Sequence, residues 1–459
     1  MENCVRNKDA IRGEDVPGYD TAGSVETNVA DGFTLVAVGD LIVSRALTKG
    51  NHLGFDKILE ILRNADATFG NMETNIFDAR SFGGYPQAEH GGAYHVSLPE
   101  LGPDLRAMGF NLLSYANNHA FEWGIEGMRE TCRALDQNAV IYAGAGANLS
   151  QASAARFLET PRGRVALVSF ASTFTPMSRA CDPAGEAPGR PGINALRLRE
   201  YITVPQATLR SLRQLRNALP YYDPSYGGPD SVALAGAKFK AGEKVGYSYE
   251  PNPEDVARIL RNVRQGKQLA DFCIVTNHGH EPGNWSQLPA DYEQSLARKF
   301  IDAGADAYIV HGPHQLRGIE IYRGKPIFYS VANFVMDDLR TPVGADMYYD
   351  HNMDPRVRTD AEVTASEMSK GYETDPGFCD PVFYESVITV SHFEKNQLAE
   401  LRLHPIDLGH SRRFANRGVP ALAAPPMAKV ILARLKRLSG TFGTELTIED
   451  NVGVIRPNS

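Results

Sequence analysis

The sequence predicts an α/β fold, in which short buried strands alternate with amphipathic helices. Two apolar runs, at 272–275 and 307–310, are too short for ordinary helices and stop at polar residues. Between them, residues 288–303 place apolar side chains at helical spacing and end at Gly304. A chain of 459 residues with 42% hydrophobic residues can bury a large core. The repeated order of strand and helix favours a layered α/β domain with stretches of parallel sheet.

The expected elements follow this alternation along the chain. Apolar runs predict strands at 33–39, 67–73, 112–116, 140–143, 156–159, 165–170, 272–275, 307–310, 318–323 and 327–330, and then a hairpin formed by 384–393 and 398–404. Helical periodicity predicts helices at 55–63, 99–108, 209–219, 253–263, 288–303 and 426–438, and one that begins near Gly124. In open α/β sheets, ligands bind at the carboxyl ends of the strands, so the residues directly after each strand are the candidates for function.

The chain is interpreted as a single domain, 33–459, preceded by a flexible N-terminal arm, 1–32. Two stretches interrupt the alternation and are expected to be loop insertions: 172–270, rich in Pro, Gly and aromatic residues, and 336–381, acidic and aromatic. Each insertion is either a lid over a site or a surface excursion or subunit contact. The sequence pattern leaves these alternatives open.

Charge and cysteine content exclude several classes of protein. The formal net charge is -8 and the pI is about 5.9, so we expect neither a nucleic acid nor a membrane as partner. The five cysteines are scattered without a CxxC pair, which excludes a disulfide framework and favours a reducing compartment. No signal-like or membrane-spanning apolar run is recognised. We therefore expect a cytoplasmic protein, and a homo-oligomer is compatible with the sequence.

Histidines follow the two predicted strands that flank the helix at 288–303. His278 and His280 come after the first strand, and His311 and His314 come after the second. A single histidine in such a place is more often a cap or an exposed residue than a ligand. Four at two neighbouring strand ends favour metal binding or catalysis, because neutral imidazoles on adjacent turns can converge on one cation.

Oxygen donors stand at the ends of earlier predicted strands. Asp40, Glu73 and Asn118, the last followed by His119, all come where an apolar run stops. Mixed oxygen and nitrogen donors are typical of hydrolytic metal sites, in which a bound water becomes acidic enough to act as nucleophile near neutral pH. We therefore expect one or two divalent ions, of zinc, manganese or iron.

Seven short motifs resemble a known family. They lie at 39–42 (GDLI), 70–73 (GNME), 116–119 (ANNH), 278–281 (HGHE), 311–314 (HGPH), 322–330 (YRGKPIFYS) and 332–334 (ANF). Their order and spacing, from about Phe33 to Gly409, are similar to those of the capsule-synthesis (CapA) proteins associated with poly-γ-glutamate, which resemble calcineurin-like metallophosphoesterases. The resemblance implies a four-layer α-β-β-α sandwich with metal at the strand ends.

The resemblance also implies roles for individual residues. The implied metal ligands are Asp40, Asn118, His278 or His280, and His311 or His314. His119 would be the general acid, and Glu73 falls in the motif where the phosphoesterases place a bridging carboxylate.

Three positions depart from the metallophosphoesterase pattern. Ile42 stands where the first motif has a histidine, and Asn71 stands where the second has an aspartate. In the last motif two residues, Gly312 and Pro313, separate histidines that alternate in the phosphoesterases. One strong metal site, or two unequal sites, is therefore expected in place of a standard dinuclear centre.

Charged residues near the motifs are candidates for substrate contact. Arg45 and Arg317 could bind a phosphate or carboxylate, or could be ordinary surface or salt-bridged arginines. Glu89 and His95 lie in a Gly-rich loop after the second motif and are expected to touch substrate. Glu281 adjoins the first histidine pair and is expected to orient an imidazole.

These features predict a metal-dependent hydrolase that acts on a small or polymeric anionic substrate. The kinship of fold suggests a phosphoester bond, and the biological association of the family suggests a γ-glutamyl amide bond. A glycoside-cleaving enzyme with Glu73 and Glu89 as an acid–base pair is an alternative. A second alternative is a non-catalytic accessory protein that binds an anionic capsule polymer.

Overall fold

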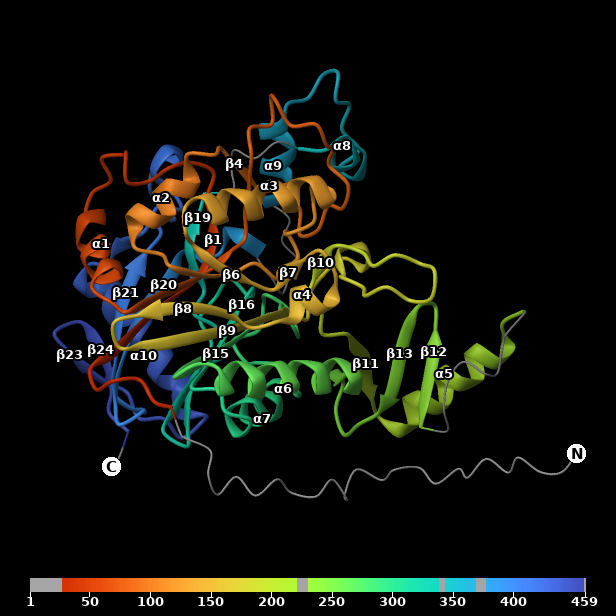
Figure 1. Cartoon of the computed structure of the whole chain (residues 1–459). Coiled ribbons are helices and arrows are strands. Elements are labelled where there is room, and N and C mark those ends of the chain that lie inside the picture. The colour runs from red at the N-terminus through yellow and green to blue at the C-terminus, as the bar shows by residue number, and fades with distance from the viewer. Residues whose placement is uncertain (1–26, 221–229, 338–342, 369–376, 458–459) are drawn as a thin grey trace, which may run out of the picture.

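Two large β-sheets hold most of the strands of the protein (Figure 1). The computed structural model describes residues 27–220, 230–337, 343–368 and 377–457. Within these residues the mixed α/β fold expected from the sequence is confirmed. None of the helices described is long and apolar enough to cross a membrane.

The larger sheet has ten strands and combines parallel with antiparallel pairs. Its order is β23-β24-β21-β20-β1-β2-β5-β6, with β19 also paired to β1 and β22 to β21. Strands β1, β2, β5, β6 and β19 are parallel, and β20 runs antiparallel to β1. The strands are β1 (Phe33–Ile42), β2 (Ala67–Met72), β5 (Leu112–Ser114), β6 (Ile141–Ala143), β19 (Asn333–Met336), β20 (Glu385–Glu394), β21 (Gln397–Asp407), β22 (Ala421–Leu422), β23 (Thr447–Glu449) and β24 (Val452–Ile455).

The second sheet has six strands in the order β17-β18-β16-β15-β9-β8. Strands β9, β15, β16 and β18 are parallel, and the edge strands β8 and β17 are antiparallel to their neighbours. The strands are β8 (Arg156–Thr160), β9 (Gly163–Ala171), β15 (Phe272–His278), β16 (Ala307–His311), β17 (Ile319–Tyr322) and β18 (Lys325–Phe328). Strands β15 and β16 are buried along their whole length, which is why they read as continuous apolar runs.

The two sheets share one apolar core. Leu35 and Phe69 of the larger sheet belong to the same buried cluster as Ile274 and Ile309 of the second. Helix α10 (Pro425–Gly440) adds its apolar face to this cluster. The core between the sheets therefore joins strands that are far apart in the sequence.

Helices cover the outer faces of both sheets. Helices α1 (Phe55–Arg63), α2 (Leu101–Met108) and α3 (Gly124–Gln137) pack on the larger sheet, and α6 (Pro253–Gln268) and α7 (Glu293–Asp302) pack on the second. Figure 1 shows α2 and α3 above the sheets and α6 and α7 below them. The arrangement follows from the alternation of side chains along a strand, which lets each strand bury both faces.

Strand β1 illustrates this two-sided burial. Leu35 and Ala37 belong to the core between the sheets, whereas Val36 and Val38 belong to the core beneath the helices of the larger sheet. The strand is therefore apolar at successive positions, and its sequence could not show the alternation of a half-exposed strand.

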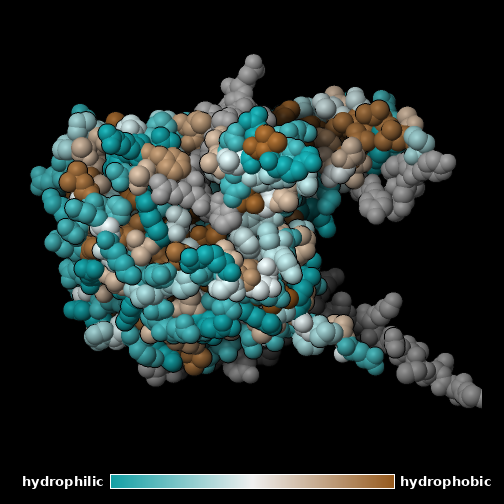
Figure 2. All heavy atoms as spheres, turned by 90° about the horizontal axis from the view of Figure 1, so that it is seen from above, coloured by the Kyte–Doolittle hydropathy of each residue, from teal (hydrophilic) through white to brown (hydrophobic). Residues whose placement is uncertain are grey.

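The insertion expected at about 172–270 is not a loop, because most of its described residues lie in regular elements. A four-stranded sheet, in the order β12-β13-β11-β14, packs with a helix into a lobe that projects from the body on the right of Figure 1 and again in Figure 2. The lobe contains β11 (Leu198–Val204), α5 (Gln206–Ala218), β12 (Ser231–Leu234), β13 (Ala237–Ala241) and β14 (Gly246–Pro251). Its strands are short and half-exposed, so they leave no apolar runs in the sequence.

The second insertion carries two helices, α8 (Ala345–Asp350) and α9 (Asp360–Met368). Met347 of α8 and Val363 of α9 pack on Tyr94 and Trp123. Residues 338–342 and 369–376 of this insertion lie outside the described residues. Shorter elements complete the chain: β3 (Asn75–Ile76), β4 (Val96–Ser97), β7 (Ala145–Gly146), α4 (Leu149–Ser153), η1 (Pro176–Ser178), β10 (Gly192–Ile193), η2 (Gly377–Cys379), η3 (Pro381–Tyr384) and η4 (Phe414–Asn416).

The structure corrects the predicted boundaries in three places. Strand β1 continues to Ile42, so Asp40 lies inside the strand and not at its end. Helix α7 begins at Glu293, because the residues before it form a loop. Most of the predicted arm, 1–26, lies outside the described residues, but Val29 is buried in the core between the sheets. The end of the predicted arm is thus packed and not flexible.

A substitution at Gly39 tests how closely β1 approaches the chain beside it. A Cβ on Gly39 would lie only 1.6 Å from the carbonyl oxygen of Ala332. We expect Gly39→Ala to lower the free energy of unfolding by about 1–3 kcal/mol, because forced overpacking shifts the backbone. Gly440→Ala is the matched control, since a Cβ there meets no atom within 4 Å. Urea unfolding of both variants measures the difference, and equal stabilities would contradict the close approach.

Candidate metal centre

Strands from both sheets end at one place, and each delivers a polar side chain there. Asp40 lies near the end of β1, Glu73 follows β2 directly, and Asn118 follows β5 after a short turn. From the second sheet, His278 and His311 are the last residues of β15 and β16. All five side chains are buried. Such a gathering needs internal partners or a ligand, because burying an unpaired polar or charged group is costly.

The two histidine motifs meet because β15 and β16 are parallel and in register. His278 stands opposite His311, and their Nδ1 atoms are 3.0 Å apart. The other ring nitrogen of His278 lies 3.1 Å from Nε2 of His280. His314 enters from the turn after β16, and its ring lies 5.3 Å from that of His280, measured between centroids. The four imidazoles therefore converge, as the strand pattern predicted.

Asp40 connects the two sheets electrostatically. Its Oδ1 lies 3.6 Å from Nδ1 of His311, and its Oδ2 lies 3.5 Å from Nδ1 of His314. The backbone N–H of Gly312 also donates to Oδ2, at 3.0 Å. The pairing of β1 with β19 shifts register directly after Asp40, an irregularity of the kind that re-aims side chains next to functional sites.

Asn71 joins the two carboxylates of the cluster. Its Nδ2 donates to Asp40 at 2.9 Å and to Glu73 at 3.3 Å. Asn117 in turn donates to Oδ1 of Asn71 at 3.2 Å, and this bond orients the amide. A neutral donor therefore stands between the carboxylates, at the position where the second metallophosphoesterase motif has an aspartate.

Three overlapping sets of residues in this cluster could hold a metal ion. The sets are Asp40, His278 and His311; Glu73, His278 and His280; and Asp40, Glu73 and His314. Within each set the ligand atoms lie within 4.8 Å of one another. Because each pair of sets has one residue in common, His278, Asp40 or Glu73, the sets describe one ion or two neighbouring ions.

Two buried oxygen atoms support a ligand at this place. Oε1 of Glu73 and Oδ1 of Asn118 are buried and have no hydrogen-bond partner among the described residues. Buried polar atoms are nearly always satisfied, so such exceptions call for an unseen partner. Oε1 of Glu73 lies 3.6 Å from Nε2 of His278. A divalent cation accepts both oxygen and imidazole nitrogen ligands, and the donor set fits one.

Protonation also favours a cation here. Burial, and then the neighbouring imidazoles, lower the pKa of His278 and His280 well below the usual range, and burial lowers the pKa of His311 to about 4. The rings are then neutral near pH 7 and keep the lone pair that a metal needs. Burial, and then the adjacent Asp40 carboxylate, raise the pKa of Glu73. A cation between these carboxylates would favour their charged forms.

His119 stands beside the cluster with a carboxylate that the sequence analysis did not identify. Its Nδ1 lies 2.5 Å from Oε1 of Glu122, and its Nε2 lies 3.7 Å from Oε1 of Glu73. The second oxygen of Glu122 accepts the backbone N–H of His95 at 2.9 Å. A carboxylate three residues after the histidine, in the turn before α3, was the available signal in the sequence.

A small enclosed cavity lies over the cluster. Its volume is about 30 Å³, and it is lined by His95, His119 and His314 on one side and by Glu367 and Phe378 of the second insertion on the other. The ring of Phe378 meets that of His314 edge-on, with centroids 5.4 Å apart. A polar cavity of this size accommodates water. Residues of the second insertion therefore form part of the wall of this cavity.

The structure gives Arg317 a different place from the substrate contact predicted for it. Its buried guanidinium donates to the backbone carbonyls of His280, Glu281, Gly283 and Ser286. These bonds hold the loop that leads from the first histidine motif to α7. Since the guanidinium is committed to this loop, Arg317 has a structural role.

The other predicted substrate contacts divide between the cavity and its surroundings. Arg45 pairs with Asp337 at 3.1 Å and donates to the carbonyl oxygen of Ala415, so it is held beside the end of β1. Glu89 accepts the backbone N–H of Gly92. His95 lines the cavity, and its ring centroid lies 4.2 Å from that of His119. Of the four, His95 is the one that the structure brings to the cavity.

Glu281 does not contact an imidazole, contrary to the prediction. It accepts hydrogen bonds from Ser172 at 2.8 Å and from Thr173 at 2.9 Å. Thr173 in turn accepts the backbone N–H of His280 at 2.8 Å. Glu281 thus supports the backbone of the motif, because its side chain points towards the loop after β9.

Other side chains orient the rings. The hydroxyl of Thr276 lies 2.8 Å from Nε2 of His311, and Oδ1 of Asn333 lies 2.8 Å from Nδ1 of His314. Nδ2 of Asn118 lies 3.1 Å from Nδ1 of His90, which fixes the amide with its oxygen unbonded. These partners come from distant strands, so spacing in the sequence could not reveal them. Partners of this kind fix the orientation of metal-binding residues.

A buried cluster of imidazoles and carboxylates, placed where strands of two facing sheets end, defines a class of α/β protein with a metal-capable centre between its sheets. The model of the bacterial capsule synthesis protein family PGA_cap matches residues 34–338, a span that contains every residue of the three metal-capable sets. The chain belongs to this family, which is related to the calcineurin-like metallophosphoesterases.

Relatives span the chain to different extents. The chain is 63% identical over 460 residues to protein y4uA of Sinorhizobium fredii, a match that covers 99% of this chain and 100% of that protein. It is 24% identical over 313 residues to the capsule biosynthesis protein CapA of Bacillus anthracis, covering 66% of this chain and 60% of that protein. The PGA biosynthesis protein CapA of Bacillus subtilis is 26% identical over 325 residues, covering 68% of this chain and 66% of that protein.

Metal content tests the centre. His311→Ala removes an imidazole from one metal-capable set, so we expect the affinity for metal to fall by more than about tenfold. His392→Ala is the matched control, because His392 is partly exposed on β20 and pairs with Glu394. Metal per chain is measured by plasma mass spectrometry after dialysis against trace divalent metal. Equal metal in wild type and His311→Ala would remove His311 from the ligand set.

Proposed function

We propose that this chain is a metal-dependent hydrolase whose centre lies where β1, β2, β5, β15 and β16 end. The observation that carries the proposal is the pair of unpartnered buried oxygens, Oε1 of Glu73 and Oδ1 of Asn118, beside neutral imidazoles. A divalent ion bound there would supply an acidified water and a Lewis acid for the substrate. The layering of helices and sheets supports the four-layer sandwich of the metallophosphoesterases as the finer description of the fold.

The residues around the proposed ion would supply negative charge and hold the imidazole rings in position. Asp40 and Glu73 supply negative charge, and Asn71 offsets the repulsion between these carboxylates by donating to both. The orienting bonds of Thr276 and Asn333 hold the imidazoles in place. Asp40 bridges the two sheets, so the same residue connects the fold to the centre.

His119 is the proposed proton donor to the leaving group. Glu122 lies at its Nδ1, so the opposite nitrogen, Nε2, is the one available to a substrate. Burial, and then the neighbouring His95 ring, lower the pKa of His119 well below its usual range. A charged Glu122 at Nδ1 would oppose this shift and favour the imidazolium form that a general acid requires. His119 lines the cavity above the cluster, where a substrate bond would lie.

The proposed substrate is anionic, with a phosphoester or a γ-glutamyl amide bond. Kinship with metallophosphoesterases supports the first, and the names of the Bacillus relatives, which refer to the biosynthesis of capsule and PGA, support the second. The engagement of Glu73 with His278 supports a metal-linked role over an acid–base pair with Glu89. The cavity of about 30 Å³ between the cluster and the second insertion would hold a water in the absence of substrate, and a substrate would require the insertion to move.

Loss of the proposed acid should abolish most turnover while leaving metal in place. Metal-loaded protein is assayed with a chromogenic phosphoester, a γ-glutamyl anilide and a nitrophenyl glycoside. On the substrate that is cleaved, His119→Asn is expected to lose about a hundred- to ten-thousand-fold in kcat. Glu122→Gln should lose a smaller part of the same factor and shift the pH profile, because it removes the charge that stabilises imidazolium.

His410→Asn serves as the control for this pair, since His410 packs on Tyr384 outside the cluster. A loss of less than about tenfold in His119→Asn would assign the proton transfer to another group. Absence of cleavage of every substrate by fully metal-loaded protein would favour the non-catalytic accessory role.

The cover formed by α8 and α9 should control access to the centre. The hydroxyl of Tyr94 donates to Asp346 of α8 at 2.6 Å, which ties the cover to the body. We expect Tyr94→Phe to change kcat/KM, whereas Tyr348→Phe should not, because Tyr348 donates to Asp360 within the cover. Replacing residues 345–368 with a Gly/Ser linker should keep metal content and lower kcat/KM strongly. Unchanged kinetics with an altered oligomeric state would show that this segment is a subunit contact.

A further inference from the structure

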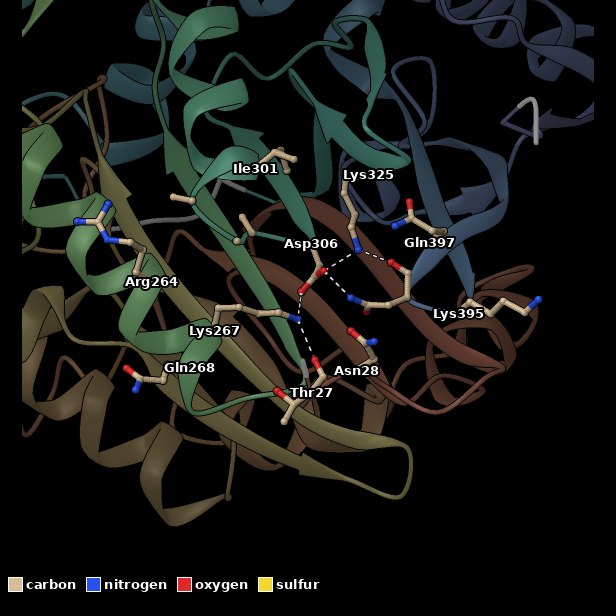
Figure 3. A pocket seen from close by; sticks show the side chains of 14 residues that line it. Thr27, Asn28, Arg264, Lys267, Gln268, Ile301, Asp306, Lys325, Lys395 and Gln397 are labelled. Carbon is tan, nitrogen blue, oxygen red and sulfur yellow. Dashed lines mark hydrogen bonds and ion pairs between the residues drawn. The ribbon is translucent and has the colours of Figure 1, made fainter. Parts of the chain in front are cut away.

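A second cavity lies at the other end of the central strands, away from the metal-capable cluster. Its volume is about 780 Å³, within the range of small-molecule sites. Figure 3 shows that its walls come from the ends of α6 and α7, the start of β18 and the hairpin between β20 and β21. Asp306, just before β16, stands at its centre.

This cavity is separate from the metal-capable cluster because the two lie at opposite ends of the same strands. Asp306 precedes the first residue of β16, and His311 is the last residue of that strand. On the neighbouring strand, seven residues run from Phe272 to His278. At about 3.3 Å per residue, the two ends lie roughly 20 Å apart. One ligand of ordinary size does not reach from the cavity to the cluster.

The lining is strongly basic in a protein of net negative charge. Four cations, Arg264, Lys267, Lys325 and Lys395, face one lining carboxylate, Asp306. The whole chain carries a formal charge of -8, so the cavity reverses the overall sign. Concave sites lined by one sign of charge concentrate ligands of the opposite sign.

Two of these cations are fixed in the floor of the cavity. Lys267 donates to Asp306 at 2.9 Å and to the carbonyl oxygen of Asp271 at 2.7 Å. Lys325 donates to the other oxygen of Asp306 at 2.7 Å. Because one carboxylate faces two ammonium groups, the floor keeps a net positive charge of one.

The other two cations have no side-chain partner among the residues that the structure describes. Arg264 and Lys395 are exposed and have no hydrogen bond or ion pair from their side chains to the described residues. They stand on opposite sides of the cavity in Figure 3, and their charged ends point away from Asp306 in the conformations drawn. The side-chain amides of Gln268 and Gln397, beside these cations, are also unpartnered within the described part of the chain. Donors are thus available on both rims above a positive floor.

We propose that this cavity binds a small molecule with two or more anionic groups, carboxylates or phosphates, that spans the rims at Arg264 and Lys395. The unpartnered guanidinium and ammonium groups donate to the anionic oxygens, and charge-assisted bonds of this kind are the strong ones. A monoanion has one charged group and can bind only one of these two cations at a time, so a polyanion is favoured. The proposal does not depend on the activity of the metal-capable cluster.

Calorimetry on the full chain, stripped of metal by a chelator and dialysed, tests the proposal. Tripolyphosphate probes the phosphate class, citrate probes the carboxylate class, and acetate is the monoanion. We expect one site per chain with a Kd below about 1 mM for at least one of the polyanions, and no saturable binding of acetate. The double variant Arg264→Ala/Lys395→Ala should weaken this binding by at least about tenfold.

A matched double variant removes the same charge elsewhere. Arg129 of α3 and Lys436 of α10 are exposed and carry no described side-chain partner, so Arg129→Ala/Lys436→Ala should bind the polyanion as wild type does. Circular dichroism checks that both variants are folded. The proposal is overturned if neither polyanion binds saturably, or if the two double variants bind equally. Binding that is lost in His311→Ala but kept in Arg264→Ala/Lys395→Ala would place the anion at the other end of the strands and also overturn it.

Discussion

The burial of two carboxylates side by side, Asp40 and Glu73, is the constraint on which the centre depends. Each is fully buried, and like charges at this separation oppose their own ionisation. Neutral hydrogen-bond donors offset this repulsion. The side-chain amide of Asn71 donates to both carboxylates, and the backbone N–H of Gly312 donates to Asp40. The imidazoles around them are held neutral by burial, so they do not compensate the charge themselves. A cluster built in this way is suited to a cation, and the geometry of the surrounding strands serves to keep it together.

Side chains outside the cluster hold the loop that carries one of its histidines. Arg317 is buried, and its guanidinium donates hydrogen bonds to backbone carbonyls of the loop that carries His280. Glu281, bonded to Ser172 and Thr173, ties the same loop to the end of β9. Above the cluster, Glu367 of α9 lines the cavity, and α8 and α9 pack on Tyr94 and Trp123 of the body. The centre is therefore fixed below by strands and loops, and covered above by a segment joined to the body through a small apolar cluster and a few polar bonds.

Individual residues show how far the centre could be predicted. Asp40, Glu73, His278 and His311 could be identified because parallel strands are buried on both faces, and a polar residue that interrupts such an apolar run stands out. Glu122 was missed because its one signal, a position three residues after His119, is shared by many exposed carboxylates on turns. Arg317 was misinterpreted because an arginine next to a histidine motif looks the same whether it faces a substrate or a loop. The role of Thr276 depends on a histidine that lies 35 positions further along the chain.

The sequence by itself determined the alternation of strand and helix, most element positions and the motifs that place the chain in its family. These features are local, since they depend on the period of apolar residues and on the polar residues that end each run. Tertiary structure alone decided that Asp40 faces His311 across the two sheets, that the first insertion is a folded lobe, and which residue partners each ring. It also brought Arg264, Asp306 and Lys395 to one basic cavity. Contacts of this kind depend on the register and packing of distant strands, which no local pattern of residues encodes.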